Sequence, residues 1–119
     1  MDISINIKEI TLHYISMELK NSFTTSFGSL KDREMIIIEM VDFDGMVGWG
    51  ECVAFREPWY TEETLQTAAH IMKDFLIPKL IQQPIYHPDE LQHLFSPVRK
   101  NPMAKSALEG AIWDLYAKK

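Results

Sequence analysis

The spacing of apolar residues changes half-way along this 119-residue chain, and that change restricts the fold class more than any other feature. Between residues 10 and 51 the spacing is that of β-strands, for example where Ile10, Leu12 and Tyr14 alternate with Thr11 and His13. From about residue 61 apolar residues recur every three or four positions, which is typical of helices. Strands first and helices second indicate an α+β fold.

Three strands are expected in the first half. The first spans about residues 10–19, the second Met35–Asp42 and the third Met46–Glu51. Asp44-Gly45 predicts a tight hairpin between the second and third, because glycine tolerates positive φ. The second strand is apolar at consecutive positions, which predicts that both its faces are covered. An antiparallel meander in chain order is the simplest sheet that these strands can form.

The second half predicts two helices before residue 100. Thr61 would cap the first, with Glu62 and Glu63 placed favourably in its first turn. Pro78 would end it, and a shorter helix would follow with Pro88 at its first position. The apolar stripe of the first helix consists of Leu65, Ala68, Ala69, Met72 and Leu76.

A third helix is expected to begin at Asn101-Pro102. Its end, DLYAKK, shows no Gly or Asn C-cap and no following Pro. Either this helix frays at the end of the chain or the chain is cut inside a longer protein, and the pattern leaves both open. The apolar stripe consists of Ala104, Ala107, Leu108, Ala111, Ile112 and Leu115.

Composition excludes several classes of partner. With 12 basic and 17 acidic residues the net charge is −5, so no nucleic acid or anionic membrane is expected as a partner. No run approaches the roughly 20 apolar residues of a membrane span. Charged residues at positions 2, 8 and 9 replace the apolar run of a signal peptide, and Cys52 is the only cysteine. These features predict a cytoplasmic protein without an internal disulfide.

Most apparent catalytic motifs fail on their spacing. Glu90 and His93 match one Glu-x-x-His element, but a di-iron site needs two copies and two further Glu-bearing helices. The four histidines lack zinc-type spacing. Neither Cys52 nor Ser26 has a base placed for it, so neither is predicted to act as a nucleophile.

Two loops and one glycine pair are more informative. Residues 21–30, NSFTTSFGSL, form an expected loop without charge that carries two phenylalanines, and residues 53–60 form another rich in aromatic rings. Such loops either fold onto their own core or meet something outside the domain. In GWGEC, the two glycines around Trp49 predict close approach of another backbone. Glu51 then has a structural role at the strand end or, as the alternative, a catalytic one.

Five motifs in order resemble the N-terminal part of enolase-superfamily proteins: FTTSFG, GWGEC, PWYTEET, LIPKL and NPMAKSALEGAIWDL. They are most similar to the muconate-lactonizing subgroup, in its o-succinylbenzoate synthase / N-acylamino acid racemase branch. The resemblance covers nearly the whole chain. It implies a capping domain over residues 1–101, a three-stranded antiparallel meander followed by helices. Residues 102–119 would begin the helix that links this cap to a (β/α)₇β barrel, which this sequence lacks.

The resemblance also implies where the chemistry lies. In the family, lysines and an Asp/Glu/Asp magnesium triad sit on the barrel, so this chain would bind no Mg²⁺ and be inactive alone. The cap selects substrate through the loops that follow its first and third strands. The matching positions are Phe23, Thr25 and Ser26 in the first loop and Phe55 and Tyr60 in the second.

The activity implied for the full-length protein is that of a magnesium-dependent lyase. It would dehydrate a succinylated hydroxycyclohexadiene carboxylate to o-succinylbenzoate for menaquinone synthesis, with N-acylamino acid racemisation as the alternative. The cap and barrel together would hold this small carboxylate substrate. A hypothesis of another class is a stand-alone binding module. For the isolated chain we expect self-association or low stability, because one sheet face and the apolar stripe of the last helix would be exposed.

Overall fold

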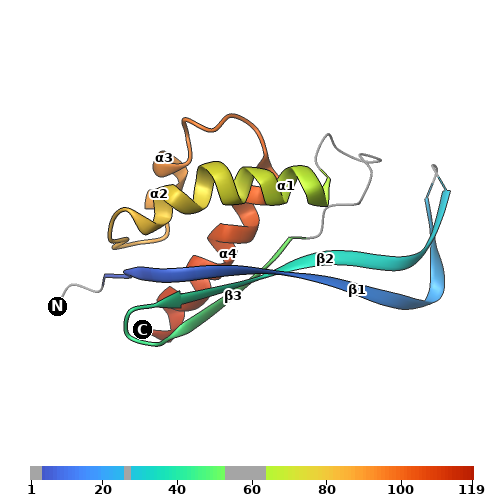
Figure 1. Ribbon diagram of the computed structural model, residues 1–119, viewed down its shortest axis with the longest axis horizontal. Helices are drawn as coiled ribbons and strands as arrows, with labels where there is room; N and C mark the ends of the chain where they lie inside the picture. The colour runs from blue at the N-terminus through green and yellow to red at the C-terminus, as the bar shows by residue number, and fades with distance from the viewer. Residues whose placement is uncertain (1–3, 26–27, 53–63) are drawn as a thin grey trace.

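A computed structural model describes residues 4–25, 28–52 and 64–119 of the chain, with backbone alone for 16–25 and 28–33 (Figure 1). The three strands pair antiparallel in the order β1-β2-β3, and helices cover one face of the sheet. The expected α+β fold and meander are therefore confirmed. The elements are β1 (Ile7–Thr25), β2 (Gly28–Asp42), β3 (Val47–Cys52), α1 (Leu65–Ile71), the π-helical turn η1 (Met72–Leu76), α2 (Ile77–Ile81), α3 (Glu90–Leu94) and α4 (Pro102–Lys118).

The first two strands are longer than their sequence pattern predicts. They stay paired from Ile7 and Asp42 to Thr25 and Gly28, so the loop expected over residues 21–30 is wrong wherever that stretch is described. Backbone hydrogen bonds extend a two-stranded ribbon without needing apolar alternation, and alternation was the signal used. The paired strands form an arm that projects beyond the helices (Figure 1).

A bulge bends this arm. Glu18 pairs with Asp32 and Phe23 with Leu30, so β1 advances five residues while β2 advances two. Three extra residues on one strand break the ladder and increase its local bend. Beyond this point the ribbon turns toward the side of the sheet that carries the helices (Figure 1).

The central strand has one covered face. Ile36, Ile38 and Met40 are fully buried. On the opposite face Met35 is also buried, whereas Ile37, Glu39 and Val41 are only half-buried. The prediction that both faces of β2 are covered is therefore wrong from Ile37 onward. The described helices form a single layer, and the other side of the sheet is open in the described part of the chain (Figure 1).

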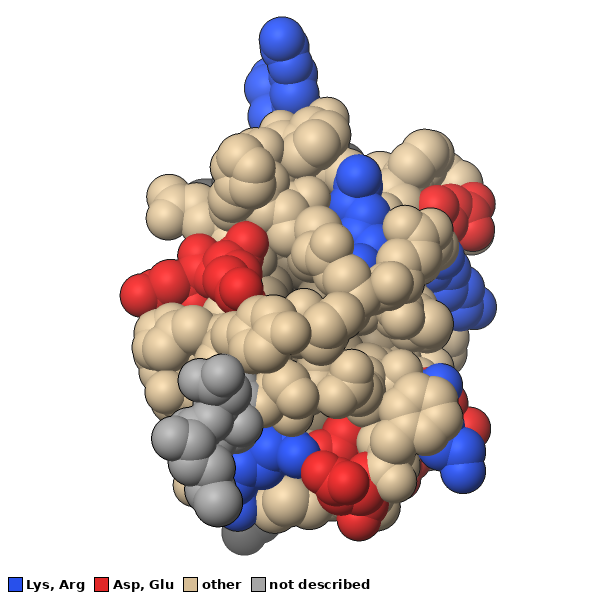
Figure 2. Space-filling view, turned by 90° about the vertical axis from the view of Figure 1, so that its left-hand side faces the viewer, with Lys and Arg blue, Asp and Glu red and all other residues tan. Residues whose placement is uncertain are grey.

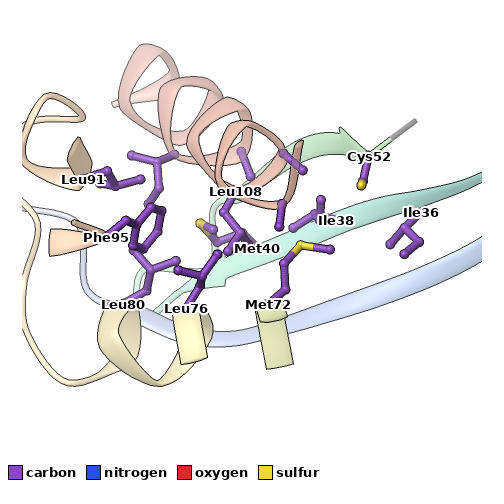
Figure 3. Close-up of a cluster of buried hydrophobic side chains, with 14 of the residues drawn as sticks. Ile36, Ile38, Met40, Cys52, Met72, Leu76, Leu80, Leu91, Phe95 and Leu108 are labelled. Atoms are coloured by element: carbon purple, nitrogen blue, oxygen red, sulfur yellow. The ribbon is translucent and has the colours of Figure 1, made fainter. Parts of the chain in front are cut away.

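The two predicted helical stripes supply most of the core. Every residue of both stripes is buried, and these side chains meet Ile38 and Met40 of β2 (Figure 3). The expectation that the stripe of the last helix is exposed is wrong, because α4 packs on β3 and β2. That helix is thus part of the core of this domain. Whether residues 102–119 also lead to a second domain stays a prediction.

Gly48 and Gly50 allow α4 to lie directly on β3. A Cβ added to Gly48 would lie 2.4 Å from the carbonyl oxygen of Ala111. A Cβ added to Gly50 would lie 2.3 Å from the carbonyl oxygen of Ala107. Backbone therefore contacts backbone at both positions, which confirms the close approach predicted from GWGEC.

Helix boundaries differ from expectation in two places. Thr64 is the N-cap of α1, in a capping box with Thr67, whereas Thr61, Glu62 and Glu63 lie outside the described residues. The helical run also continues past Pro78 to Ile81. The π-helical turn before Pro78 re-spaces the preceding carbonyls, and this accommodates a ring that would disrupt a regular α-helix.

The shorter helices and turns follow the sequence more closely. α3 begins at Glu90 after an Asp89 N-cap. Pro88, which was expected at the first helical position, therefore lies two residues before the helix begins. α4 begins at Pro102 after Asn101, as predicted. Gly45 has φ of 86° in the turn between β2 and β3, which confirms the hairpin signal.

Asp42 organises the β2–β3 turn. Its buried Oδ1 accepts the backbone N–H groups of Asp44 and Met46, each at 3.0 Å. Lys119 Nζ lies 3.0 Å from Asp42 Oδ2, as an ion pair without good hydrogen-bond direction, and 2.7 Å from Asp44 Oδ2. The two carboxylates raise the pKa of Lys119, Asp44 most strongly. Basic and acidic side chains also adjoin one another at this end of the molecule (Figure 2).

The outer edge of β3 is occupied by side chains of α4. The Trp49 N–H donates to Asp114 Oδ2 at 2.8 Å, and Lys118 Nζ donates to the Val47 carbonyl at 2.8 Å. Lys118 also pairs with Asp114 at 3.0 Å. The Trp49 hydrogen bond, followed by Lys118, lowers the pKa of Asp114. These contacts satisfy backbone groups that an edge strand would otherwise offer to another chain.

We expect Asp114→Asn to lower the free energy of unfolding at pH 7 by up to about 1 kcal/mol, a small value because the side chain is partly exposed. Because the pKa of Asp114 is lowered in the folded state, its carboxylate stabilises the fold above the unfolded-state pKa of about 3.9. That stabilisation is lost as the pH falls through the folded-state pKa. The deficit should therefore shrink toward pH 3, as followed by urea unfolding. Glu109→Gln on the same helix is the control, and a deficit of constant size would contradict the charge argument.

Candidate functional site

The structure places two of the five predicted substrate-site residues. The backbones of Phe23 and Thr25 lie in β1 near the end of the arm, opposite Leu30 and Gly28 respectively. Ser26, Phe55 and Tyr60 lie outside the described residues. Their assignment to a site therefore stays a prediction.

The described residues that flank the two predicted loops lie at one end of the molecule. β3 ends at Cys52, opposite Ile36, and the arm continues beyond this point. α1 begins at Leu65 at the same end of the helical layer (Figure 1). The segment between β3 and α1 is thus anchored at both ends on the side from which the bent arm projects.

The end of β3 borders an open hollow of about 290 Å³. The described residues that line it are Glu51, Pro102, Met103 and Ser106. Glu51 is exposed and borders this hollow, but its position in the strand places its side chain on the face of the sheet opposite to the one that Gly50 presents to α4. Its structural role and the alternative catalytic role both stay predictions. The sequence did not indicate that α4 lines this hollow, because Asn101-Pro102 predicted only the beginning of a helix.

The described residues lack an obvious catalytic or metal centre. Among them, no group of three His, Cys, Asp or Glu side chains is arranged to hold a metal ion. Glu90 accepts the backbone N–H groups of Tyr86 and His87 at 2.7 and 3.0 Å, so its role beside α3 is structural. Cys52 is buried. Within the same part of the chain, no helix has the length and apolar character needed to cross a membrane.

Comparison with known domain families decides which fold family this is. The family described as mandelate racemase / muconate lactonizing enzyme, N-terminal domain, matches residues 8–119. The chain belongs to this family. The match includes α4, in agreement with the packing of that helix in the core of the domain.

Relatives within the mandelate racemase / muconate lactonizing enzyme family are longer than this chain. An o-succinylbenzoate synthase from Geobacillus stearothermophilus is 55% identical over 98% of this chain but only 31% of its own length. An N-succinylamino acid racemase from Thermus thermophilus is 35% identical, over 94% of this chain and 30% of its own. A solved enolase-superfamily structure from Listeria innocua superposes with a TM-score of 0.92 at 43% identity, over 96% of this chain and 31% of its own. The chain thus spans about a third of each relative.

Proposed function

We propose that this chain is the substrate-capping domain of an o-succinylbenzoate synthase. The observation that carries the proposal is the 55% identity to a synthase over 98% of the chain, against 35% to a racemase. The whole enzyme would dehydrate a succinylated hydroxycyclohexadiene carboxylate to o-succinylbenzoate, in the cytoplasm, as a step of menaquinone synthesis. N-acylamino acid racemisation is the alternative activity, because both reactions begin by removing a proton next to a carboxylate.

In this proposal the cap shapes and closes the site. The end of the β1–β2 arm and the segment after β3 would cover the substrate from the end of the domain at which the arm projects and β3 ends (Figure 1). Apolar rings there would exclude water and strengthen electrostatic interactions beneath them. Magnesium, which the rest of the enzyme would bind, supplies charge stabilisation for the deprotonated substrate. The described residues do not form a ligand set for this ion, so we assign them no part in holding it.

The proposal is tested with a chimera in which residues 1–119 replace the matching third of the Geobacillus stearothermophilus synthase. We expect the chimera to dehydrate the synthase substrate in the presence of Mg²⁺. Phe23→Ala or Phe55→Ala should lower kcat/KM by about tenfold or more, equivalent to roughly 1.4 kcal/mol of lost transition-state stabilisation. The control is Phe43→Ala, an exposed phenylalanine in the β2–β3 turn, away from the arm.

Three outcomes would redirect the proposal. Equal activity in the Phe23, Phe55 and Phe43 variants would remove the substrate role of the two loops. Activity on N-succinylamino acids without dehydration would favour the racemase. No activity on either substrate would favour a stand-alone binding module. Self-association of the isolated chain stays a prediction.

A further inference from the structure

The two edges of the sheet differ in what covers their backbone groups. At the outer edge of β3, side chains of α4 bind the Trp49 N–H and the Val47 carbonyl. At the outer edge of β1, Ile5 exchanges backbone hydrogen bonds with Ile85, at 2.7 and 2.9 Å. Over residues 8–15 of β1, no further partner for this edge occurs in the described part of the chain. An uncovered strand edge of this length is a template for another strand.

The pairing across the sheet determines which residues of β1 face this edge. Backbone groups in an antiparallel sheet point alternately to one side and to the other. Trp49 directs its N–H toward α4, so its partner in β2, Glu39, directs its backbone groups toward β1. Glu39 is paired there with Thr11, and the residues on either side of Thr11 therefore face outward. The same alternation continues along the strand, and the outward-facing residues, which we call the free edge, are Ile10, Leu12, Tyr14 and Ser16.

The free edge lacks the usual protection against pairing. Residues 10–17 contain no Lys, Arg, Asp, Glu, Pro or Gly, whereas charged residues and proline commonly protect natural edge strands. Tyr14 and Ile15 are 59% and 37% exposed, so apolar surface accompanies the unpaired backbone groups. A strand paired with this edge would cover both kinds of surface.

A second copy of the same strand fits the free edge. When two copies run antiparallel with His13 facing His13, every residue of the free edge lies opposite another residue of the free edge, so each such pair can exchange backbone hydrogen bonds. Each His13 already pairs with Glu39 of its own copy at 2.8 Å, so the two rings meet without an uncompensated charge. The pairs are Ile10 with Ser16 and Leu12 with Tyr14.

Opposite charges select this register. Lys8 of one copy stands opposite Glu18 of the other, and twofold symmetry makes this pair occur twice. A shift of two residues in one direction would place Lys8 opposite Ser16. The same shift in the other direction would place Glu18 opposite Ile10. Opposite charges on neighbouring strands stabilise a sheet, and both shifted registers lose these two pairs.

We propose that two copies of this chain pair through the free edges of β1 and form one continuous sheet of six strands, three from each copy. Side chains of α4 cover the other edge of each copy, and the bulge after Glu18 ends the pairing along β1. The assembly is therefore a closed twofold dimer and does not grow into a fibre. This proposal does not rest on the activity proposed above.

Sedimentation velocity over a range of concentrations tests the dimer with charge variants of the 119-residue chain. Lys8→Glu and Glu18→Lys each place like charges across the interface and should raise the dimer Kd at least about tenfold. Combining the two substitutions restores opposite charges, so the Kd should return close to the wild-type value. Glu109→Lys, at an exposed position of α4, is the control and should leave the Kd unchanged. A chain that stays monomeric up to about 1 mM, or a double variant as weak as the single ones, would overturn the proposal.

Hydrogen exchange of single amides, followed by NMR, locates the interface. The N–H groups of Ile10, Leu12 and Tyr14 should exchange at least about tenfold more slowly in the dimer than in a diluted, monomeric sample. Those of Thr11 and His13, which face β2, should be protected in both samples. Equal exchange of the three edge amides at both concentrations would place the dimer contact on another surface and overturn the proposal.

The chimera shows whether the free edge also pairs in a longer protein. Hydrogen exchange by mass spectrometry follows peptides that cover residues 10–16. Protection that is lost in Lys8→Glu would support a second copy as the occupant. Protection that persists in Lys8→Glu would assign the edge to the remaining part of the enzyme, and no protection would leave the edge unoccupied, so either result would overturn the proposal. Neither readout uses activity, so a failed dimer and a failed enzymatic proposal are distinguished.

Discussion

Gly50→Ala is expected to lower the free energy of unfolding by about 3 kcal/mol, at the upper end of the usual cost of overpacking. The new Cβ would lie 2.3 Å from the Ala107 carbonyl oxygen and 3.0 Å from the Ala111 amide nitrogen. Both atoms belong to the backbone of α4, so no side-chain rotation relieves the clash. The helix must move away from β3, and its buried stripe then packs less well.

Urea unfolding at pH 7 measures this loss, and the chain contains a matched control. Gly110→Ala makes the same chemical change in the same domain, at a position where the added methyl meets nothing within 4 Å. It should raise stability by up to about 1 kcal/mol through helix propensity. If both alanine variants were equally stable, the direct contact between α4 and β3 would be contradicted.

Asp42→Ala is the second substitution with a large expected effect, also about 3 kcal/mol, in the range for removing one partner of a buried, hydrogen-bonded charge. It removes the acceptor for the Asp44 and Met46 N–H groups and leaves Lys119 with one carboxylate instead of two. The turn loses its internal hydrogen bonds, and the end of α4 loses its ion pair with the buried carboxylate of the hairpin.

Two further variants separate the hydrogen bonds from the charge. Asp42→Asn keeps an acceptor for the turn amides, so its loss should be smaller than that of Asp42→Ala. Asp44→Ala removes only an exposed partner of Lys119 and should cost less than about 1 kcal/mol. Because folding raises the pKa of Lys119, the ion pairs of this side chain contribute to stability below its unfolded-state pKa. This contribution is lost as the pH rises through its folded-state pKa. The difference between wild type and Asp42→Asn should therefore narrow in strongly alkaline buffer. Equal losses for Asp42→Ala and Asp44→Ala at pH 7 would contradict the special role of Asp42.

The parts of the fold that followed from sequence are those with a strong periodic or turn signal. The two helical stripes, the Gly45 turn and the close approach at Gly48 and Gly50 all depend on short spacings that few other structures satisfy. The arm could not be predicted from the sequence, because residues 19–32 lack apolar alternation and their pairing depends on backbone hydrogen bonds. Pro78 was misleading, because a local rule against proline does not anticipate a π-helical turn before it.

The candidate site was less predictable than the fold. Phe23, Thr25, Ser26, Phe55 and Tyr60 were assigned through family resemblance, and the structure adds only the backbone positions of the first two. The hollow beside Glu51 involves α4, about fifty residues away along the chain, and no local pattern in either segment indicates that they meet. Such sites depend on tertiary packing, which here depends on the two glycines of β3.

The bulge in β1 separates the direction of the arm from the packing of the core. From Glu9 to Glu18 each residue of the strand keeps a partner in β2; the register changes between Glu18 and Phe23, and once more at the start of the strand between Ile7 and Glu9. An insertion or deletion between those two residues would therefore turn the end of the arm without shifting any core side chain to the wrong face of the sheet. If the end of the arm contacts the substrate, as proposed above, a change in the length of this one bulge would alter substrate preference at little cost to folding stability.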